Sequence, residues 1–179
     1  THADRFTVDG KSITMEEDVQ FAHYDPNVAS LMQLGKWFDY MRENGVYDNT
    51  RIILVADHGR GLYLNWDRVI DNGPDTDFFF PLLMVKDFNA KGFSFSDTFM
   101  TTADVPTLAT SGLIDNPTNP FTGNAINANA KYDRPFYAFM SYDWDTSKNN
   151  GNQFFPGTWY RVDNQNARDK RNWVMVGEN

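Results

Sequence analysis

The chain has 179 residues, of which 41% are hydrophobic and 16% aromatic, so it is large and apolar enough to form a globular domain with a buried core. Its net charge of −8 argues against a nucleic-acid partner, because nucleic-acid binding needs a concentration of basic side chains. The absence of cysteine excludes disulfides, thiolate metal ligands and a cysteine nucleophile, and no apolar run is long enough to span a membrane.

The first 24 residues carry mixed signals. Asp9-Gly10 is a strong hairpin signal and predicts a tight turn within residues 8–11. The chain opens at Thr1-His2-Ala3, without an initiator methionine and without a signal peptide, and we expect it to be a piece of a longer protein.

A helix is predicted over residues 25–44. Asp25 can cap its first turn, Pro26 suits the first helical position, and Gly45 is a natural stop. Apolar side chains recur at helical spacing and form one stripe along this helix: Val28, Leu31, Leu34, Phe38 and Met41.

Two apolar runs after this helix predict strands. Residues 51–56 are continuously apolar from Ile52 to Ala56, which favours a strand that is buried on both faces, as in a parallel sheet. The next run covers residues 78–85, and Pro81 within it indicates an edge or a bulge.

The second half of the chain predicts a short helix, a long loop and three strands. The helix is predicted from Ala103 to Ser111, with Thr102 or Asp104 as its cap and Gly112 as its stop. Residues 115–131 are rich in Asn, Pro, Thr and Gly and are typical of a loop. Beyond them, short alternating runs predict antiparallel strands over 136–142, 158–162 and 172–176.

Asp57-His58-Gly59 directly follows the first predicted strand. Ligands of open α/β sheets bind at the carboxyl ends of strands, and aspartate and neutral histidine are good ligands for Zn²⁺, Mn²⁺ and related ions. Gly59 lets the backbone turn sharply and leaves room for an ion or a substrate. The stretch therefore predicts a metal site; the alternative is a strand-to-loop turn in which both side chains satisfy backbone groups.

Two other histidines are present. His2 can reach the same region if it also follows a strand, whereas His23 has no evident partner in the sequence. A metal site needs about four donors, and Asp57 and His58 would supply two of them.

Four segments of the chain, taken in this order, form one set of sequence motifs: Thr1-His2, Gly45 to Gly59, Phe80 to Val85, and Thr102-Ala103-Asp104-Val105-Pro106-Thr107-Leu108. In order and spacing they resemble the sulfatase-like branch of the alkaline phosphatase superfamily, and within it the lipoteichoic-acid-synthase and phosphoethanolamine-transferase group. The resemblance covers about residues 1–125. The tail from residue 132 is similar, more loosely, to the small antiparallel subdomain of such enzymes.

This resemblance implies an α/β fold, namely the C-terminal part of an alkaline-phosphatase-like three-layer domain with a mainly parallel sheet and flanking helices. Residues 1–131 would form the C-terminal half of that core, and residues 132–179 the small antiparallel subdomain. The family also implies an extracytoplasmic location, in the periplasm or at the cell surface, and a longer parent protein that is membrane-anchored in some relatives.

The function implied by the resemblance is a metal-dependent hydrolase or phosphotransferase that acts on a phosphate or sulfate ester. Asp57 and His58 would bind a divalent metal (Mn, Zn, Mg or Ca), and His2 would contact the charged oxygens of the substrate or the leaving group. The nucleophile of this family lies upstream of the Thr-His motif, so no catalytic nucleophile is expected in this chain. We therefore expect the isolated chain to be inactive and to bind metal weakly or not at all.

Two alternatives remain open from the sequence. The chain can belong to a non-catalytic binding module that keeps the scaffold without the reaction centre, or to a phosphotransferase of surface glycans or lipid head groups, as opposed to a soluble sulfatase. A sheet that lacks its upstream strands would expose an apolar edge, which predicts either a homo-oligomer formed through that edge or a local rearrangement near residues 1–24.

Other conspicuous residues have structural interpretations beside the functional ones. Trp66 and Asp67 can shape a substrate pocket or pack locally, and Tyr142-Asp143-Trp144-Asp145 is more typical of a solvated turn than of a Ca²⁺ loop. The mildly basic stretch Ala167–Arg171 is interrupted by an acid and predicts a turn. A cross-strand aromatic cluster is predicted for Trp159, Tyr160 and Trp173.

Overall fold

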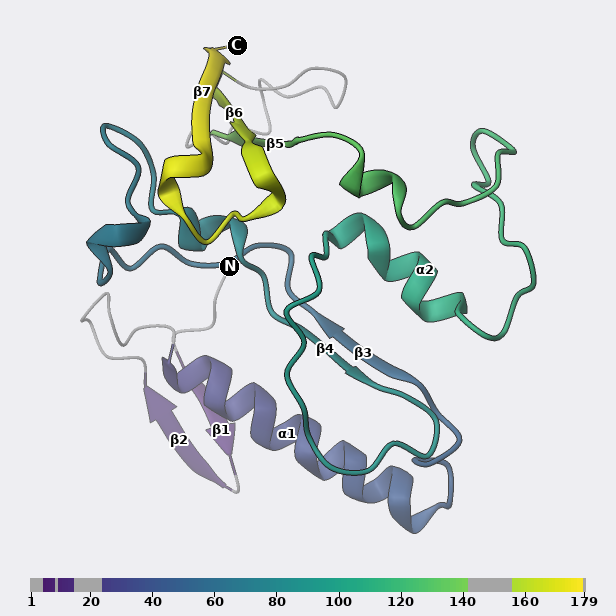
Figure 1. The fold of residues 1–179 in the computed structure, drawn as a ribbon. Coiled ribbons are helices and arrows are strands. Elements are labelled where there is room, and N and C mark those ends of the chain that lie inside the picture. Colours follow the sequence, from purple (N-terminus) through teal and green to yellow (C-terminus); the bar gives the residue numbers. More distant parts are fainter. Residues whose placement is uncertain (1–4, 9, 15–23, 142–155, 179) are drawn as a thin grey trace. The chain divides into compact units, whose positions relative to one another are not determined.

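The computed structural model describes residues 5–8, 10–14, 24–141 and 156–178 (Figure 1). The chain divides into two compact units, of which the first comprises Thr1–Ile52 with Val85–Phe93 and the second Ile53–Met84 with Ser94–Asn179. The described residues mix helices with small antiparallel sheets, which is compatible with the α/β class, and they include no parallel strand pair. The domain boundary after residue 131 stays a prediction.

The first unit begins with a hairpin of β1 (Arg5–Val8) and β2 (Lys11–Thr14), which pair antiparallel with Val8 opposite Lys11. Gly10 has a φ of +77°, a backbone conformation that glycine adopts without a steric penalty. The predicted turn within residues 8–11 is therefore confirmed as a hairpin connection, although Asp9 itself lies outside the described residues.

Helix α1 (Tyr24–Glu43) contacts β1 and confirms the predicted helix. Its predicted start is wrong, because the helix begins at Tyr24 and Asp25 lies inside its first turn instead of capping it. Gly45, with a φ of +68°, ends it by donating its N–H to the carbonyl of Arg42 at 3.0 Å. Met41 in the predicted apolar stripe is buried, but Leu31 is 53% exposed. No described helix combines the length and the apolarity needed to cross a bilayer.

Polar contacts join residues 85–93 to the segment that follows α1 within the same unit. Lys86 donates through Nζ to the carbonyl of Tyr47 and, at 2.9 Å, to that of Thr50. Arg51 and Asp87 form an ion pair at 2.9 Å. These contacts tie the start of residues 85–93 to the loop between α1 and β3.

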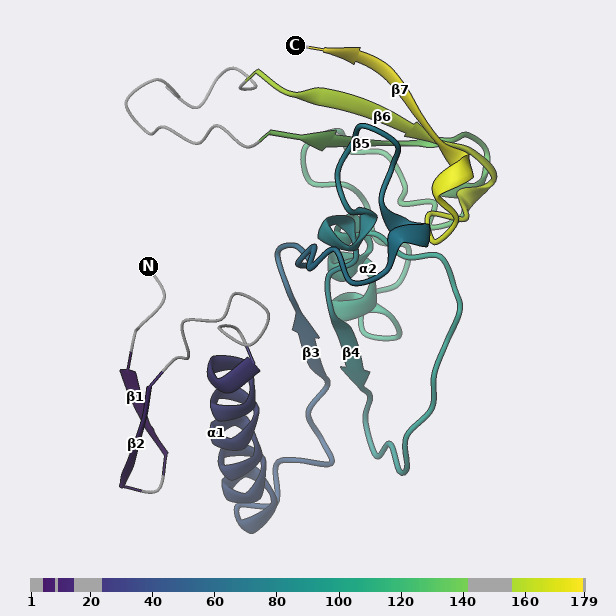
Figure 2. The ribbon, with the colours of Figure 1, turned by 90° about the vertical axis from the view of Figure 1, so that its left-hand side faces the viewer.

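Strands β3 (Ile52–Val55) and β4 (Leu83–Lys86) pair with each other and run in opposite directions, as Figure 2 shows. The antiparallel ladder continues beyond the strands, where the N–H of Ala56 donates to Leu82 and that of Gly59 to Phe78, each at 2.9 Å. The predicted strand at 51–56 is confirmed, but its burial on both faces is wrong, because Val55 is 44% exposed. In the predicted run 78–85, only the second part is strand, since Thr76–Phe79 forms a 3₁₀ turn.

Strands β5 (Phe136–Met140), β6 (Thr158–Val162) and β7 (Trp173–Glu178) form an antiparallel sheet in that order (Figure 1). The three predicted C-terminal strands and their antiparallel pairing are thereby confirmed. The sheet contributes the main buried cluster of the second unit: Ala138, Tyr160, Val162 and Trp173, with Ile70, Phe79, Phe136, Met140 and Ala167 packed against it.

The predicted aromatic cluster is present in part. Tyr160 and Trp173 meet edge to face with ring centroids 6.1 Å apart, and Trp173 also contacts Phe79 at 4.9 Å. Trp159 packs instead on its cross-strand partner Phe139, at 4.9 Å. Successive residues of a strand point to opposite faces, and Tyr160 takes the face of the buried cluster.

Helix α2 (Val105–Thr110) confirms the predicted short helix, which ends before Gly112 at a φ of +71°. Asp104 occupies the residue before α2, as predicted for a cap, but its carboxylate turns back and accepts the Thr101 N–H at 2.7 Å. The same carboxylate pairs with Lys131 at 3.1 Å, where both side chains are more than four-fifths buried. This pair joins the start of α2 to the end of the long polar loop.

Candidate metal site at the end of β3

Asp57 and His58 lie immediately after β3, as the sequence predicts. Their side chains are exposed, by 90% for Asp57 and 67% for His58. Both groups are therefore open to an ion or a ligand from solvent, while the backbone that carries them continues a hydrogen-bonded strand pair. Among the described residues, no third histidine or carboxylate lies close enough to Asp57 and His58 to share a metal ion with them.

The two side chains are arranged by local hydrogen bonds. Asp57 accepts the His58 N–H through Oδ1 at 2.9 Å, so the oxygen considered for binding an ion is the other one, Oδ2. The His58 Nδ1 atom lies 2.7 Å from the Gly59 carbonyl oxygen. Because a carbonyl oxygen only accepts, this contact favours the tautomer with its proton on Nδ1, and the lone pair is then on Nε2.

The two remaining donor atoms are close to the spacing that one ion requires. His58 Nε2 and Asp57 Oδ2 are 3.8 Å apart. Two ligands at about 2.1 Å from one ion, at a tetrahedral angle, are about 3.4 Å apart. A small rotation of either exposed side chain would bring the two atoms to this spacing.

The backbone after the pair is held by close packing that only glycine permits. Gly59 donates its N–H to the Phe78 carbonyl, and a Cβ at this position would lie 2.7 Å from the Phe80 carbonyl oxygen. A Cβ at Gly61 would lie 2.5 Å from the Phe78 ring and 2.9 Å from Cβ of Asp75. The sequence predicts a sharp turn at Gly59, with room for an ion or a substrate, but it does not indicate the close packing at Gly59 and Gly61.

A polar turn faces these glycines. It is the 3₁₀ turn Thr76–Phe79, capped by Asp75, and Asp77 within it pairs with Arg68. Asp75 and Thr76 are the buried polar residues of the described chain, at 1% and 0% exposure. An Asp two residues before a backbone N–H that it caps is a recognisable signal, but no sequence pattern shows that the turn packs on Gly59.

The loop after the candidate site is also tied to the C-terminal segment. Trp66 is 72% exposed, and its carbonyl accepts from Lys170 Nζ at 3.3 Å, while the same Nζ lies 3.4 Å from Asp71. Asp67 is exposed and its N–H is capped by Asn65 at 3.1 Å. The contribution of Trp66 and Asp67 to a substrate pocket stays a prediction.

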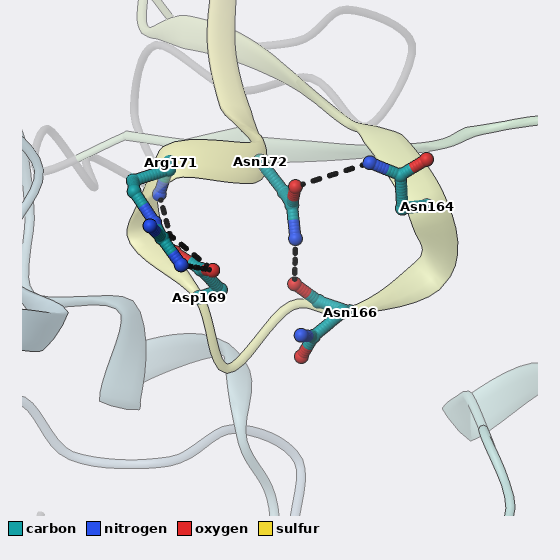
Figure 3. Close-up of polar contacts among 5 residues, drawn as sticks. All are labelled: Asn164, Asn166, Asp169, Arg171 and Asn172. Atoms are coloured by element: carbon teal, nitrogen blue, oxygen red, sulfur yellow. Dashed lines mark hydrogen bonds and ion pairs between the residues drawn. The ribbon is translucent and has the colours of Figure 1, made fainter.

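The segment that carries Lys170 is a self-paired turn (Figure 3). Asp169 accepts from the Arg171 guanidinium and from the Arg171 N–H, and these hydrogen bonds lower the pKa of Asp169 to about 2. Asn172 donates to the Asn166 carbonyl at 2.9 Å and accepts from Asn164 at 3.3 Å. The basic stretch is therefore a turn, as the sequence predicts, and Arg171 within it pairs with Asp169.

Several predicted residues lie outside the described part of the chain: Thr1, His2, His23 and Tyr142–Asp145. The substrate-contacting role of His2 thus stays a prediction, as do the ligand roles of Asp57 and His58. Comparisons of the chain with protein-family models, curated proteins and solved structures found no match.

Proposed function

We propose that this chain is part of a metal-dependent enzyme that hydrolyses or transfers a phosphate or sulfate ester, with Asp57 and His58 as ligands of one divalent cation. The observation that carries the proposal is the 3.8 Å spacing of Asp57 Oδ2 and His58 Nε2, both exposed at the end of β3. A carboxylate oxygen beside an imidazole nitrogen suits Zn²⁺ or Mn²⁺, and the carboxylate alone also suits Mg²⁺ or Ca²⁺.

The chemistry divides between the cation and the protein. A bound divalent cation lowers the pKa of a nucleophile and neutralises charge on the ester's non-bridging oxygens. Asp57 supplies negative charge that holds the cation, and the Gly59 carbonyl orients His58 through Nδ1, as a second acceptor commonly does for a ligand histidine. In this proposal His2 contacts the substrate's charged oxygens, and the nucleophile and further ligands come from sequence upstream of His2.

The same family resemblance also supports a proposal for the domain architecture and for the cellular location. We propose that the chain is the C-terminal part of an alkaline-phosphatase-like three-layer domain, whose mainly parallel sheet includes strands from upstream sequence. We also propose that this domain lies outside the cytoplasm. Strand β7 is an outer strand of its sheet and exposes Val174, Met175 and Val176. An outer strand with apolar side chains is the surface through which self-association would occur.

The test is metal analysis with phosphatase and sulfatase assays on the longer protein that contains this chain. Asp57→Ala and His58→Ala should each remove bound metal and lower kcat/KM at least 100-fold, as expected for loss of a ligand to a catalytic metal. Asp115→Ala, at an exposed acid in the long polar loop, is the matched control and should leave both unchanged. Unchanged turnover in both ligand variants contradicts the proposal, and a folded protein without metal or activity favours the non-catalytic module.

A further inference from the structure

Asp75 is a buried carboxyl group that the proposed metal chemistry does not use. It is 1% exposed, and burying such a group is costly unless its oxygens are hydrogen-bonded. Its Oδ1 accepts the Asp77 N–H at 3.0 Å, which caps the turn Thr76–Phe79. Its Oδ2 accepts the Tyr63 N–H at 2.9 Å, twelve residues earlier in the chain.

The second of these bonds holds an unusual backbone conformation. Tyr63 has a φ of +55°, in the left-handed region that non-glycine residues rarely adopt and that costs energy for a bulky side chain. A hydrogen bond from its N–H to a buried carboxylate oxygen stabilises this conformation. Without that acceptor, Tyr63 is free to return to an ordinary conformation and to shift the segment that precedes it.

That segment is the one that follows the candidate ligands. Between His58 and Tyr63, the backbone packs on the capped turn at Gly59 and at Gly61, which lies against the Phe78 ring and Cβ of Asp75. The Gly59 carbonyl in turn orients the His58 ring through Nδ1. A continuous set of contacts therefore leads from Asp75 to Nδ1 of the His58 ring, whose other nitrogen, Nε2, is the proposed ligand.

We propose that Asp75 is a positioning residue, which fixes residues 59–63 against the turn and thereby orients His58 beside Asp57. Asp75 acts through the backbone and does not touch the ion. This inference rests on the proposed function for the ligand roles of Asp57 and His58, but its structural part, the orientation of His58, is measurable without any metal.

The test uses Asp75→Ser in the full chain. Serine is a good cap, so it can keep the bond to the Asp77 N–H, but it is too short to reach Tyr63 as well. We expect the Tyr63 amide to exchange its hydrogen at least about 10-fold faster, with little change at Asp77, and the affinity for Mn²⁺ to fall about 10-fold, as for loss of an outer-shell partner. Asp115→Ser, the same substitution at an exposed acid of the long polar loop, is the matched control and should change none of these.

The His58 ring signals in NMR spectra decide the inference if this chain binds Mn²⁺ too weakly to measure, as expected for the isolated chain. The proposed function is judged separately, by metal analysis of the longer protein. A change of the His58 ring signals in Asp75→Ser then supports positioning. Faster exchange at Tyr63 with unchanged His58 signals and unchanged Mn²⁺ affinity overturns it, because Asp75 would then stabilise only its own loop. If Asp75→Ser does not fold, Asp75→Asn, which keeps one acceptor oxygen in the same volume, provides the same comparison.

Discussion

The carbonyl oxygen of Asp77 lies where a side chain on Gly59 would begin, so these two residues approach more closely than any other residue type at position 59 would allow. The contact places the turn Thr76–Phe79 directly against the backbone that carries Asp57 and His58. The candidate site is therefore defined as much by this packing as by the two ligand side chains.

Gly59→Ala should lower the free energy of unfolding by about 1–3 kcal/mol, because the new methyl group overlaps two carbonyl oxygens and forces the backbone apart. Urea denaturation followed by circular dichroism measures the change. Gly177→Ala in β7 is the control, since a Cβ there meets nothing within 4 Å. Equal losses of stability in the two variants would refute the close packing at Gly59.

Trp173 holds the C-terminal sheet to the turn near the candidate site. It is buried, contacts the rings of Phe79 and Tyr160, and donates its Nε1–H to the Ala167 carbonyl at 2.8 Å. Trp173→Ala should therefore cost about 3–5 kcal/mol of unfolding free energy. Trp66→Ala removes an indole that is 72% exposed and should change stability by less than about 0.5 kcal/mol. Similar denaturation midpoints for the two variants would contradict this account of the core.

The ion pair between Asp104 and Lys131 is the most buried pair for which the described residues give side-chain exposures, at 12% and 17%. Lys131→Met removes one partner and leaves a buried carboxylate, which should cost roughly 3 kcal/mol. The matched control is Lys91→Met, which breaks the exposed pair with Asp48 and should cost less than about 1 kcal/mol. Thermal denaturation compares the two, and an equal shift in Tm would be inconsistent with a buried pair.

The pKa of Asp169 should be measurable at about 2, because it accepts hydrogen bonds from the Arg171 side chain and backbone. A pKa lowered in the folded state stabilises the turn above the ordinary value of 3.8, and this stabilisation is lost as the pH falls from about 4 towards 2. Arg171→Ala should raise the pKa of Asp169 towards 3.8 in a carboxyl-carbon NMR titration. The pKa of Asp87, lowered by the Phe88 N–H and Arg51, should not move, and an unshifted Asp169 would contradict the assigned cause.

Local signals in the sequence are sufficient to predict most of the individual helices, strands and turns. Gly45 at the end of α1, the Asp-Gly turn between β1 and β2, and the alternating residues of β5 to β7 each act within a few residues of the structure they specify. Short-range conformational preferences decide such features, so the structure confirms them.

Features that depend on contacts between distant residues were not predictable in the same way. A continuously apolar strand is compatible with parallel or antiparallel pairing, and β3 pairs antiparallel with β4 because the chain returns through the turn Thr76–Phe79. The position of the candidate site at the end of β3 followed from the sequence. Its support from Asp75 did not, since the bond to Tyr63 joins residues twelve positions apart and no periodic pattern marks it.

The proposal that Asp57 and His58 bind one cation can be tested by a Mn²⁺ titration of the labelled chain, observed by NMR. We expect the signals of residues 57–59 and of the His58 ring to broaden first. Asp57→Ala should remove this preference, and Asp115→Ala should keep it. Broadening that is spread evenly over the acidic surface, or that persists at His58 in Asp57→Ala, would contradict the claim.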